Sequence, residues 1–430
     1  MDLRSPSHRP DSGPFQDELT MDTNSRIAER PPSDVPRSRE AAGQPQRLDL
    51  KARTAAVAAI AAQWATAVDS EARFPEEAFA ELRRQRLMGI MVPSDLGGEG
   101  ASLSDIVDVC YQLGQACAST SMIYAMHQAC LACLVRHGHD HAWHRSLLRR
   151  VAGDQLLLAS STTEGQGGGN VRSSSAAVEY TDTGIRLERA ATVVSYGSRA
   201  DAILTTARRA ADAPASDQVL VAFLKEDYRI EPLQGWDSLG MRGTCSSGFR
   251  LNATGTAEQI LPEPYDAIHP QSMVPVSHLA WAGTWAGIAA GAVERARAFV
   301  RHAARHNGGN MPPGAAHFTK ASASLRTLRG LIASSLRAYE EIADDRKSLA
   351  SLDFQAVMNL TKVEASELAV AIVLTTMKVC GLSGYRNDTE FSVGRALRDA
   401  LSSPIMISND RILGNLAGTM LMTPVPAGIE

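Results

Sequence analysis

The residues of this sequence best suited to holding a metal ion stand close together. Cys130 and Cys133 are separated by two residues, and the histidines that follow them are His137, His139, His141 and His144. Thiolates and imidazoles are the usual ligands of zinc, so a zinc site is one hypothesis. Cysteines three positions apart on an apolar helix face the same way, however, and usually pack into a core. We therefore interpret the segment as a packed helix and expect no metal.

A second group of residues is suited to the polar edge of a cofactor. Thr162 and Thr163 are followed by a glycine-rich run that contains Gly168 and Gly169. Glycine lets backbone N–H groups approach anionic oxygens closely, although the same residues also build ordinary turns. Neither Gly-x-Gly-x-x-Gly nor Gly-x-x-x-x-Gly-Lys-Ser/Thr follows a predicted strand, so neither a Rossmann nor a P-loop nucleotide site is expected. The Gly-x-Ser-x-Gly turn of serine hydrolases is missing as well.

Composition excludes several classes of protein. With 43 Lys and Arg against 47 Asp and Glu, the net charge is −4, without the basic field of a nucleic-acid binder. Six cysteines among 430 residues are too few for a disulfide framework, and no secretory signal precedes them, so we expect a reduced, cytoplasmic protein. The longest uncharged stretch, residues 267–293, is interrupted by prolines and histidines, which favours a buried helix over a membrane span.

Periodicity divides the chain into four segments. Residues 1–46 hold seven of the 20 prolines and one aromatic residue, which predicts a disordered tail. Residues 47–152 repeat their apolar positions with a helical period and predict a helical domain, whereas residues 153–265 show short runs of period two between Gly- and Ser-rich turns and predict an antiparallel β domain. The helical period returns in residues 266–424 and predicts a helical bundle. The expected fold is mixed α and β, mainly α.

Four segments in this order carry a resemblance to a known family. They are Leu87-Met-Gly-Ile-Met-Val-Pro-Ser-Asp-Leu-Gly-Gly, Thr162-Thr-Glu-Gly within its glycine-rich run, Gly240-Met-Arg-Gly-Thr, and Lys378-Val-Cys-Gly-Leu-Ser-Gly followed by Arg398-Asp-Ala. Together with the helix–β–helix order, they resemble the acyl-CoA dehydrogenase family of flavoproteins over about residues 50–424. The resemblance implies an N-terminal helical domain, a middle β domain, a C-terminal helical bundle and bound FAD.

Flavin presents polar edges that need fixed donors and acceptors, and its N5 atom must face the substrate with water excluded. The motifs of the family imply these cofactor-binding residues: Thr162, Thr163, Gly168, Gly169, Val193, Ser195, Gly381, Gly384, Asn409 and Arg411. By the resemblance, Ser195 stands beside N5 and Val193 replaces a shielding Trp. Gly381 and Gly384 would follow the adenosine end, which in the family reaches a neighbouring subunit.

The resemblance also implies a Glu that removes the α-proton of an acyl thioester, and here the sequence departs from the pattern. Ile407 occupies the usual position of this Glu, and Ser277 occupies the position that some branches of the family use instead. His278 and His127 fall on helices that the family turns toward the substrate, and imidazole titrates near neutral pH, so both are candidate catalytic residues. The alternative that we favour is structural: His278 as a hydrogen-bonded histidine inside a bundle, and His127 as a packing or helix-surface histidine.

The expected activity is α,β-desaturation of an acyl thioester, carried on coenzyme A or on an acyl carrier protein, with hydride transfer to flavin N5 and an electron-transfer flavoprotein as acceptor. One alternative is a flavin-dependent monooxygenase of the same fold, which needs a flavin reductase but no α-proton base. Another is a catalytically silent flavin-binding homologue. The long amphipathic helices and the shared cofactor of the family favour a homodimer or homotetramer.

Overall fold

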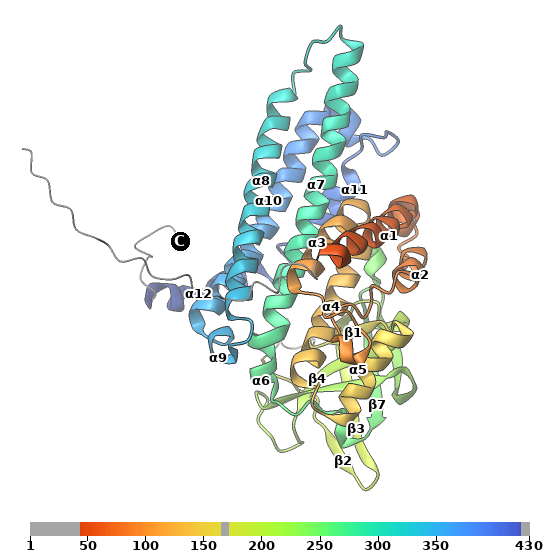
Figure 1. Cartoon of the computed structure of the whole chain (residues 1–430), viewed down its shortest axis with the longest axis vertical. Helices are drawn as coiled ribbons and strands as arrows, with labels where there is room; N and C mark the ends of the chain where they lie inside the picture. Colours follow the sequence, from red (N-terminus) through yellow and green to blue (C-terminus); the bar gives the residue numbers. More distant parts are fainter. Residues whose placement is uncertain (1–43, 165–171, 423–430) are drawn as a thin grey trace, which may run out of the picture. The chain divides into compact units, whose positions relative to one another are not determined.

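The computed structural model describes residues 44–164 and 172–422. The predicted tail lies outside the described residues except for its last three positions, which begin helix α1 (Gln44–Ser70). Five helices form the N-terminal part: α1, α2 (Glu76–Arg84), α3 (Leu103–Ala116), α4 (Ala118–His137) and α5 (Ala142–Asp154) (Figure 1). The Ser102 side chain accepts from the Asp105 N–H and the Asp105 carboxylate accepts from the Ser102 N–H, which fixes the start of α3.

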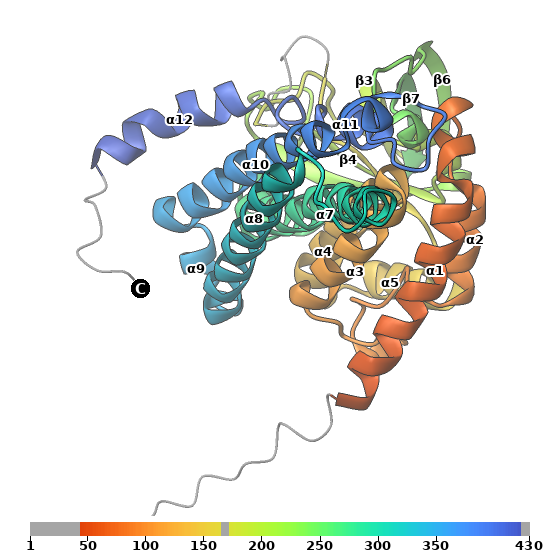
Figure 2. The ribbon, with the colours of Figure 1, turned by 90° about the horizontal axis from the view of Figure 1, so that it is seen from above.

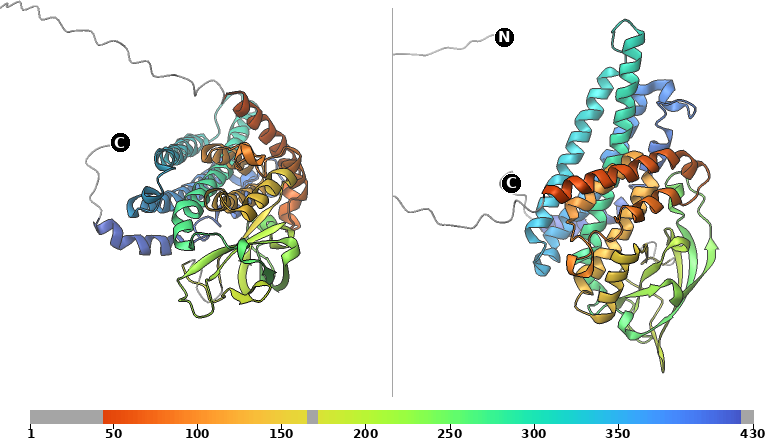
Figure 3. Two further views of the ribbon diagram at one scale, coloured as in Figure 1. Left: turned by 60° about the horizontal axis from the view of Figure 1, so that its bottom comes forward. Right: turned by 45° about the vertical axis from the view of Figure 1, so that its right-hand side comes forward.

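The strands form two sheets. The first has the order β1 (Leu158–Ser161), β4 (Ala202–Arg208), β5 (Gln218–Leu224), and the second has the order β2 (Glu179–Thr181), β3 (Gly184–Val194), β7 (Ser247–Gly255), β6 (Tyr228–Gln234). The second sheet is antiparallel throughout, as predicted, but β1 pairs with β4 in parallel. A parallel pair needs a long crossover, and β2 and β3 lie within it. In both views of Figure 3 the strands gather in one block beside the helices.

The C-terminal part is helical. A short helix α6 (Tyr265–Ile268) and a π-helical turn (His269–Met273) lead into α7 (Val274–His306). The remaining helices are α8 (Ala315–Ile342), α9 (Arg346–Leu349), α10 (Leu352–Tyr385), α11 (Gly394–Ala400) and α12 (Asn409–Met422). Helices α7, α8 and α10 pack against one another, and α3 and α4 pack on the other side of α7 (Figure 2). This mainly helical fold with a middle β domain is the one the sequence predicts.

Among the described residues, two helices are long and apolar enough to cross a membrane, namely α4 and α10. In α4 89% of the apolar window is buried by the rest of the chain, whereas in α10 the corresponding share is 44%. Helix α4 is therefore the central core helix of the N-terminal part. Helix α10 leaves apolar side chains exposed, among them Val357, Leu374 and Leu382.

Helices α3 and α7 cross closely at two glycines. A Cβ atom added at Gly287 would lie 2.4 Å from the Tyr111 carbonyl oxygen, and one added at Gly114 would lie 2.5 Å from the Thr284 carbonyl oxygen. No side chain fits at either position without moving a backbone. The two glycines therefore set the distance between the N-terminal helices and the bundle.

We expect Gly287→Ala to lower the free energy of unfolding by about 1–3 kcal/mol, because the added methyl group overpacks this crossing. Urea denaturation measures the change. Gly330→Ala on α8 is the matched control, since nothing lies within 4 Å of its added Cβ. There the better helix propensity of Ala should stabilise the protein by about 0.5–1 kcal/mol. Equal effects of the two substitutions would contradict the close crossing.

Candidate active site

A cavity of about 330 Å³ opens where the middle domain meets the bundle. Its walls come from α4, the end of β1, the π-helical turn, α7, α10 and α12, and include Met126, Met273, Trp281, Ile412 and Leu416. Polar residues also line the cavity, among them Thr162, Ser277, His278, Asn359 and Arg411. A mostly apolar cavity with a few polar groups is typical of a small-molecule site. Among the described residues that line it there is no Asp or Glu.

His278 lies in the wall of this cavity and is almost fully buried. Its Nδ1 lies 3.2 Å from the Met358 carbonyl oxygen. Because a carbonyl only accepts, Nδ1 carries the proton, and the neutral ring presents Nε2 as an acceptor. Burial, with smaller contributions from Lys362 and His269, lowers the pKa of His278 to about 3 against the Met358 hydrogen bond. The imidazole is therefore neutral at pH 7 and a weak base, better suited to accepting a hydrogen bond than to removing a proton.

Ile407 also lines the cavity, in a turn between α11 and α12. Its φ of 51° lies in the left-handed region, which is strained for a β-branched residue. Lys362 on α10 holds this turn: its buried Nζ donates to the carbonyl oxygens of Ser403 at 3.1 Å and Ile407 at 2.9 Å, and to Asn409 Oδ1 at 2.7 Å. Desolvation lowers the pKa of Lys362 to about 8. Sequence reasoning missed Lys362, because a lysine within an apolar helix gives no sign of what it contacts.

Several predicted cofactor residues lie at or directly after the ends of β1 and β3. The Tyr196 hydroxyl, directly after Ser195, donates to the Leu158 carbonyl oxygen at 2.9 Å and so ties the end of β3 to β1. Thr163 is partly buried just beyond Thr162 at the end of β1, and the Ser195 and Ser246 hydroxyls lie 2.8 Å apart. Val193 is 44% exposed. These hydroxyl groups and the open face at Val193 suit the polar edges and the flat ring of a flavin.

The other predicted cofactor residues lie in different parts of the structure. Gly168 and Gly169 lie outside the described residues. Gly381 takes a φ of 53° inside α10, and Gly384 is buried one turn later. Arg411 lines the cavity. Asn409 is buried, and its amide is engaged by Lys362, Ser366 and Glu367, so it supports the turn. Its contact with the adenosine half of a cofactor stays a prediction.

His127, the other candidate catalytic residue, is not among the residues that line this cavity. His127 is fully buried in α4, with Nε2 2.8 Å from the Met88 carbonyl oxygen and Nδ1 accepting from the Leu158 N–H at 3.0 Å. Both ring nitrogens are therefore occupied by backbone groups, and burial lowers the pKa of His127 to about 4. Its role is to fasten α4 to the start of β1.

Cys130 and Cys133 are buried in α4, where burial raises the pKa of both thiols. His137 does not join them, because its Nε2 lies 2.9 Å from Ser272 Oγ and its Nδ1 3.1 Å from a Glu263 carboxylate oxygen. Within residues 44–164 and 172–422, no three His, Cys, Asp or Glu side chains are grouped to hold a metal ion.

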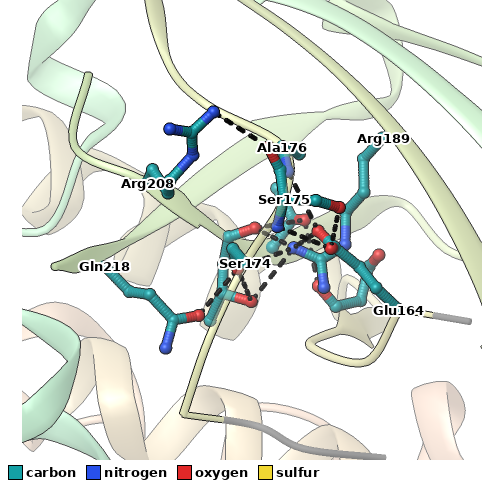
Figure 4. Close-up of polar contacts among 10 residues, drawn as sticks. Glu164, Ser174, Ser175, Ala176, Arg189, Arg208 and Gln218 are labelled. Carbon is teal, nitrogen blue, oxygen red and sulfur yellow. Dashed lines mark hydrogen bonds and ion pairs between the residues drawn. The ribbon is translucent and has the colours of Figure 1, made fainter. Parts of the chain in front are cut away.

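A buried ion pair lies beside the candidate flavin region (Figure 4). The Glu164 carboxylate accepts from the Ser175 N–H at 2.7 Å, from the Ser175 hydroxyl and from the Ala176 N–H at 3.3 Å. Arg189 Nη1 lies 3.2 Å from Glu164 Oε1 and also donates to Thr206. Glu164 thus joins the residues after β1 to those before β2. Burial lowers the pKa of Arg189 to about 10, while the Ser175 hydrogen bonds and Arg189 lower that of Glu164 against the opposing effect of its burial.

Two family models match the chain. Residues 46–154 match the model described as acyl-CoA dehydrogenase, N-terminal domain, and residues 271–418 match the model described as acyl-CoA dehydrogenase, C-terminal domain. Together these ranges span more than half of the chain and flank the β domain on both sides.

Individual proteins are similar over most of the chain. A cyclohex-1-ene-1-carbonyl-CoA dehydrogenase from Geobacter metallireducens is 26% identical over 83% of this chain and 92% of its own length. A dibenzothiophene monooxygenase from Mycolicibacterium goodii is 24% identical over 72% of this chain and 76% of its own. Among solved structures, KijD3 in complex with dTDP has a TM-score of 0.78 at 20% identity, covering 89% of this chain and 99% of that one.

Breaking the Glu164–Arg189 pair should destabilise the protein more from one side than from the other. Glu164→Gln should lower the free energy of unfolding by about 3–5 kcal/mol, because it leaves the buried charge of Arg189 without its partner. Arg189→Met should lower it by about 1–3 kcal/mol, because Glu164 is only partly buried and keeps its hydrogen bonds to Ser175 and Ala176. Arg186→Met, at an exposed position of the same strand, is the control and should change it by less than about 0.5 kcal/mol. The double variant should lose less than the sum of the single losses. Single losses under about 1 kcal/mol would show that the pair does not stabilise the fold.

The lowered pKa of His278 predicts acid sensitivity. The unfolded imidazole binds a proton near pH 6.5, whereas the buried one stays neutral down to about pH 3, so stability is lost as the pH falls through this window. The free energy of unfolding of the wild type should decrease between pH 7 and pH 4. In His278→Gln this decrease should be smaller by up to about 3 kcal/mol. Urea denaturation across this range tests it, with His317→Gln, at an exposed position of α8, as control. Parallel pH profiles of wild type and His278→Gln would refute it.

Proposed function

Because this chain belongs to the acyl-CoA dehydrogenase family, we propose that it is a flavin-dependent oxidoreductase, and that its reaction is oxygenation of a substrate held in the 330 Å³ cavity. The observation that carries this choice is the absence of Asp and Glu among the described residues of the cavity wall. Removal of an α-proton needs an acceptor within about 2.6–3.2 Å whose pKa is near the working pH. Ile407 and Ser277 are not acceptors of this kind, and His278 has a pKa of about 3.

The residues present fit a flavin. The hydroxyl groups of Thr162, Thr163 and Ser195 can supply polar partners, and Val193 leaves an exposed apolar surface. Reduced flavin bound there supplies the chemistry of dioxygen activation: one oxygen atom goes to the substrate, the other leaves as water, and the flavin is oxidised. A separate flavin reductase is then the partner that restores the reduced cofactor.

The chain's own residues hold the substrate and exclude water. Trp281 lines the cavity, and its Nε1–H has no hydrogen-bond partner among the described residues, so it is free to donate to a substrate oxygen. Neutral His278 accepts, and the Asn359 amide both donates and accepts. The apolar walls keep bulk water away from the reacting atoms, which protects a reactive oxidant.

A second candidate is α,β-desaturation of an acyl thioester on coenzyme A or on an acyl carrier protein. It is favoured by the similarity to cyclohex-1-ene-1-carbonyl-CoA dehydrogenase over 92% of that protein's length. Its electrons would pass to an electron-transfer flavoprotein. The cavity would then need a base other than the Glu of the family, and His278 is the nearest group available in the described wall.

We also propose a homodimer or homotetramer in the cytoplasm. The exposed apolar side chains of α10, with Leu413 and Met420 on α12, support an oligomer, because unpaired apolar faces of this kind usually pack against another chain.

The proposed function predicts two results with purified, flavin-loaded protein. Acyl-CoA thioesters added without oxygen should leave the flavin absorbance near 450 nm unchanged. Chemically reduced protein mixed with ¹⁸O₂ should place one labelled atom in a bound substrate, detected by mass spectrometry of a panel of aromatic compounds and acyl thioesters. Trp281→Phe keeps the ring and removes the donor, so it should weaken substrate binding about tenfold while flavin content is unchanged.

Anaerobic bleaching by a thioester would establish desaturation instead. The silent homologue predicts neither bleaching nor incorporation of label. Phe substituted for Trp236, whose Nε1 donates to the Met241 carbonyl oxygen away from this cavity, is the matched control for Trp281→Phe. It should leave substrate binding within about twofold of wild type.

A further inference from the structure

A second cavity, of about 570 Å³, lies apart from the candidate active site and shares none of its lining residues. It is enclosed by the end of α1, the turn after β6, the C-terminal half of α7, the α10–α11 loop and α11. Four arginines line it: Arg242, Arg295, Arg395 and Arg398. The size is within the usual range for a small ligand, and the lining is strongly cationic.

Two of the four arginines are balanced by a carboxylate or by carbonyl groups. Arg398 forms a bidentate pair with Asp69, with Nη1 2.9 Å from Oδ1. Arg242 donates to the carbonyl oxygens of Asp69 at 2.8 Å and Ser238 at 3.2 Å. Asp69 is thus already engaged. The other carboxylate of the lining, Glu390, is exposed at the rim.

The other two arginines are not balanced. Arg395 donates only to neutral groups, the Thr66 hydroxyl at 3.3 Å and the Ala116 carbonyl oxygen at 3.4 Å. Arg295 makes no hydrogen bond or ion pair with any described residue, and burial together with the charge of Arg395 lowers its pKa. Asp399 lies behind them and attracts Arg295, but it is buried and accepts from the Met241 N–H at 2.7 Å. Positive charge therefore remains uncompensated in the cavity.

Without an anion such a cluster destabilises the folded state, because each partly buried cation has lost hydration and is repelled by a neighbouring cation. Part of the remaining lining is suited to oxygen-rich anions: Thr66 and Ser392 provide hydroxyl groups and Asn387 provides an amide. The Thr389 and Ser70 hydroxyls already donate to the carbonyl oxygens of Ser383 and Ala67. The planar fork of Arg matches phosphate oxygens two at a time.

We infer that this cavity binds a small ligand carrying a pyrophosphate group, with Arg295 and Arg395 as its main contacts. Two kinds of ligand carry this group: free inorganic pyrophosphate and a nucleoside diphosphate. The cavity has room for either. This inference does not depend on which reaction the candidate active site performs.

The experiment is isothermal titration of the flavin-loaded protein with inorganic pyrophosphate and with ADP, at constant ionic strength. Arg295→Gln should weaken binding of the tighter ligand by about tenfold or more, because it removes a charged hydrogen-bond donor. Arg395→Gln should do the same and serves as an independent variant. Arg297→Gln, on the same helix but exposed and paired with Glu294, is the matched control and should bind within about twofold of wild type.

A second readout needs no ligand. Without anion, Arg295→Gln should raise the melting temperature, because it removes an uncompensated, partly buried cation, and Arg297→Gln should not. Tighter binding of ADP than of pyrophosphate would identify a nucleotide, and the reverse would identify the free anion. No binding of either at about 10 mM, equal binding by Arg295→Gln, or release of flavin on addition of ADP would each overturn the inference.

Discussion

The crossing of α3 and α7 at Gly114 and Gly287 is the contact on which the rest of the structure depends. It brings two backbones together where a single methyl group would collide. Helix α7 is thereby held between the N-terminal helices and the bundle, and its buried residues run through its whole N-terminal half. The N-terminal half supplies Ser277, His278 and Trp281 to one cavity, and the C-terminal half supplies Arg295 to the other. Because a helix rises about 1.5 Å per residue, these two sets lie about 21–27 Å apart along one helix.

Polar side chains buried around this helix are held by hydrogen bonds to backbone groups as much as by opposite charges. Lys362 is held by two carbonyl oxygens and an amide, and in return it fixes the strained turn that presents Ile407. His278 is held by a carbonyl oxygen of α10. Such groups lose their hydration on folding, so they persist only where the surrounding backbone replaces it. The candidate active site is consequently shaped by tertiary contacts rather than by any one motif.

The sequence was sufficient to predict the order of domains, because helical and strand periods are local properties of the chain. It did not predict the parallel pairing of β1 with β4, since pairing depends on which strands meet after a crossover. His127 and Asn409 were assigned from motif position, and both turned out to satisfy buried backbone or side-chain groups. The partners of Lys362 and Arg189 lie far away in sequence, and Arg295 has no partner among the described residues. Sequence spacing reveals neither a distant partner nor a missing one.

The charge pattern of the candidate active site argues for its chemistry independently of any motif. Its described wall holds Arg172, Arg411 and histidines whose pKa values are lowered, such as His269 at about 4, but no carboxylate. A site of this kind stabilises negative charge on a substrate or cofactor, and it does not stabilise the protonated base that proton removal would create. Adding a carboxylate at Ile407 would place it near Lys362 and Arg411, whose positive charges would lower its pKa and weaken it as a base. The charges around Ile407 therefore support the proposed oxygenation more than proton removal.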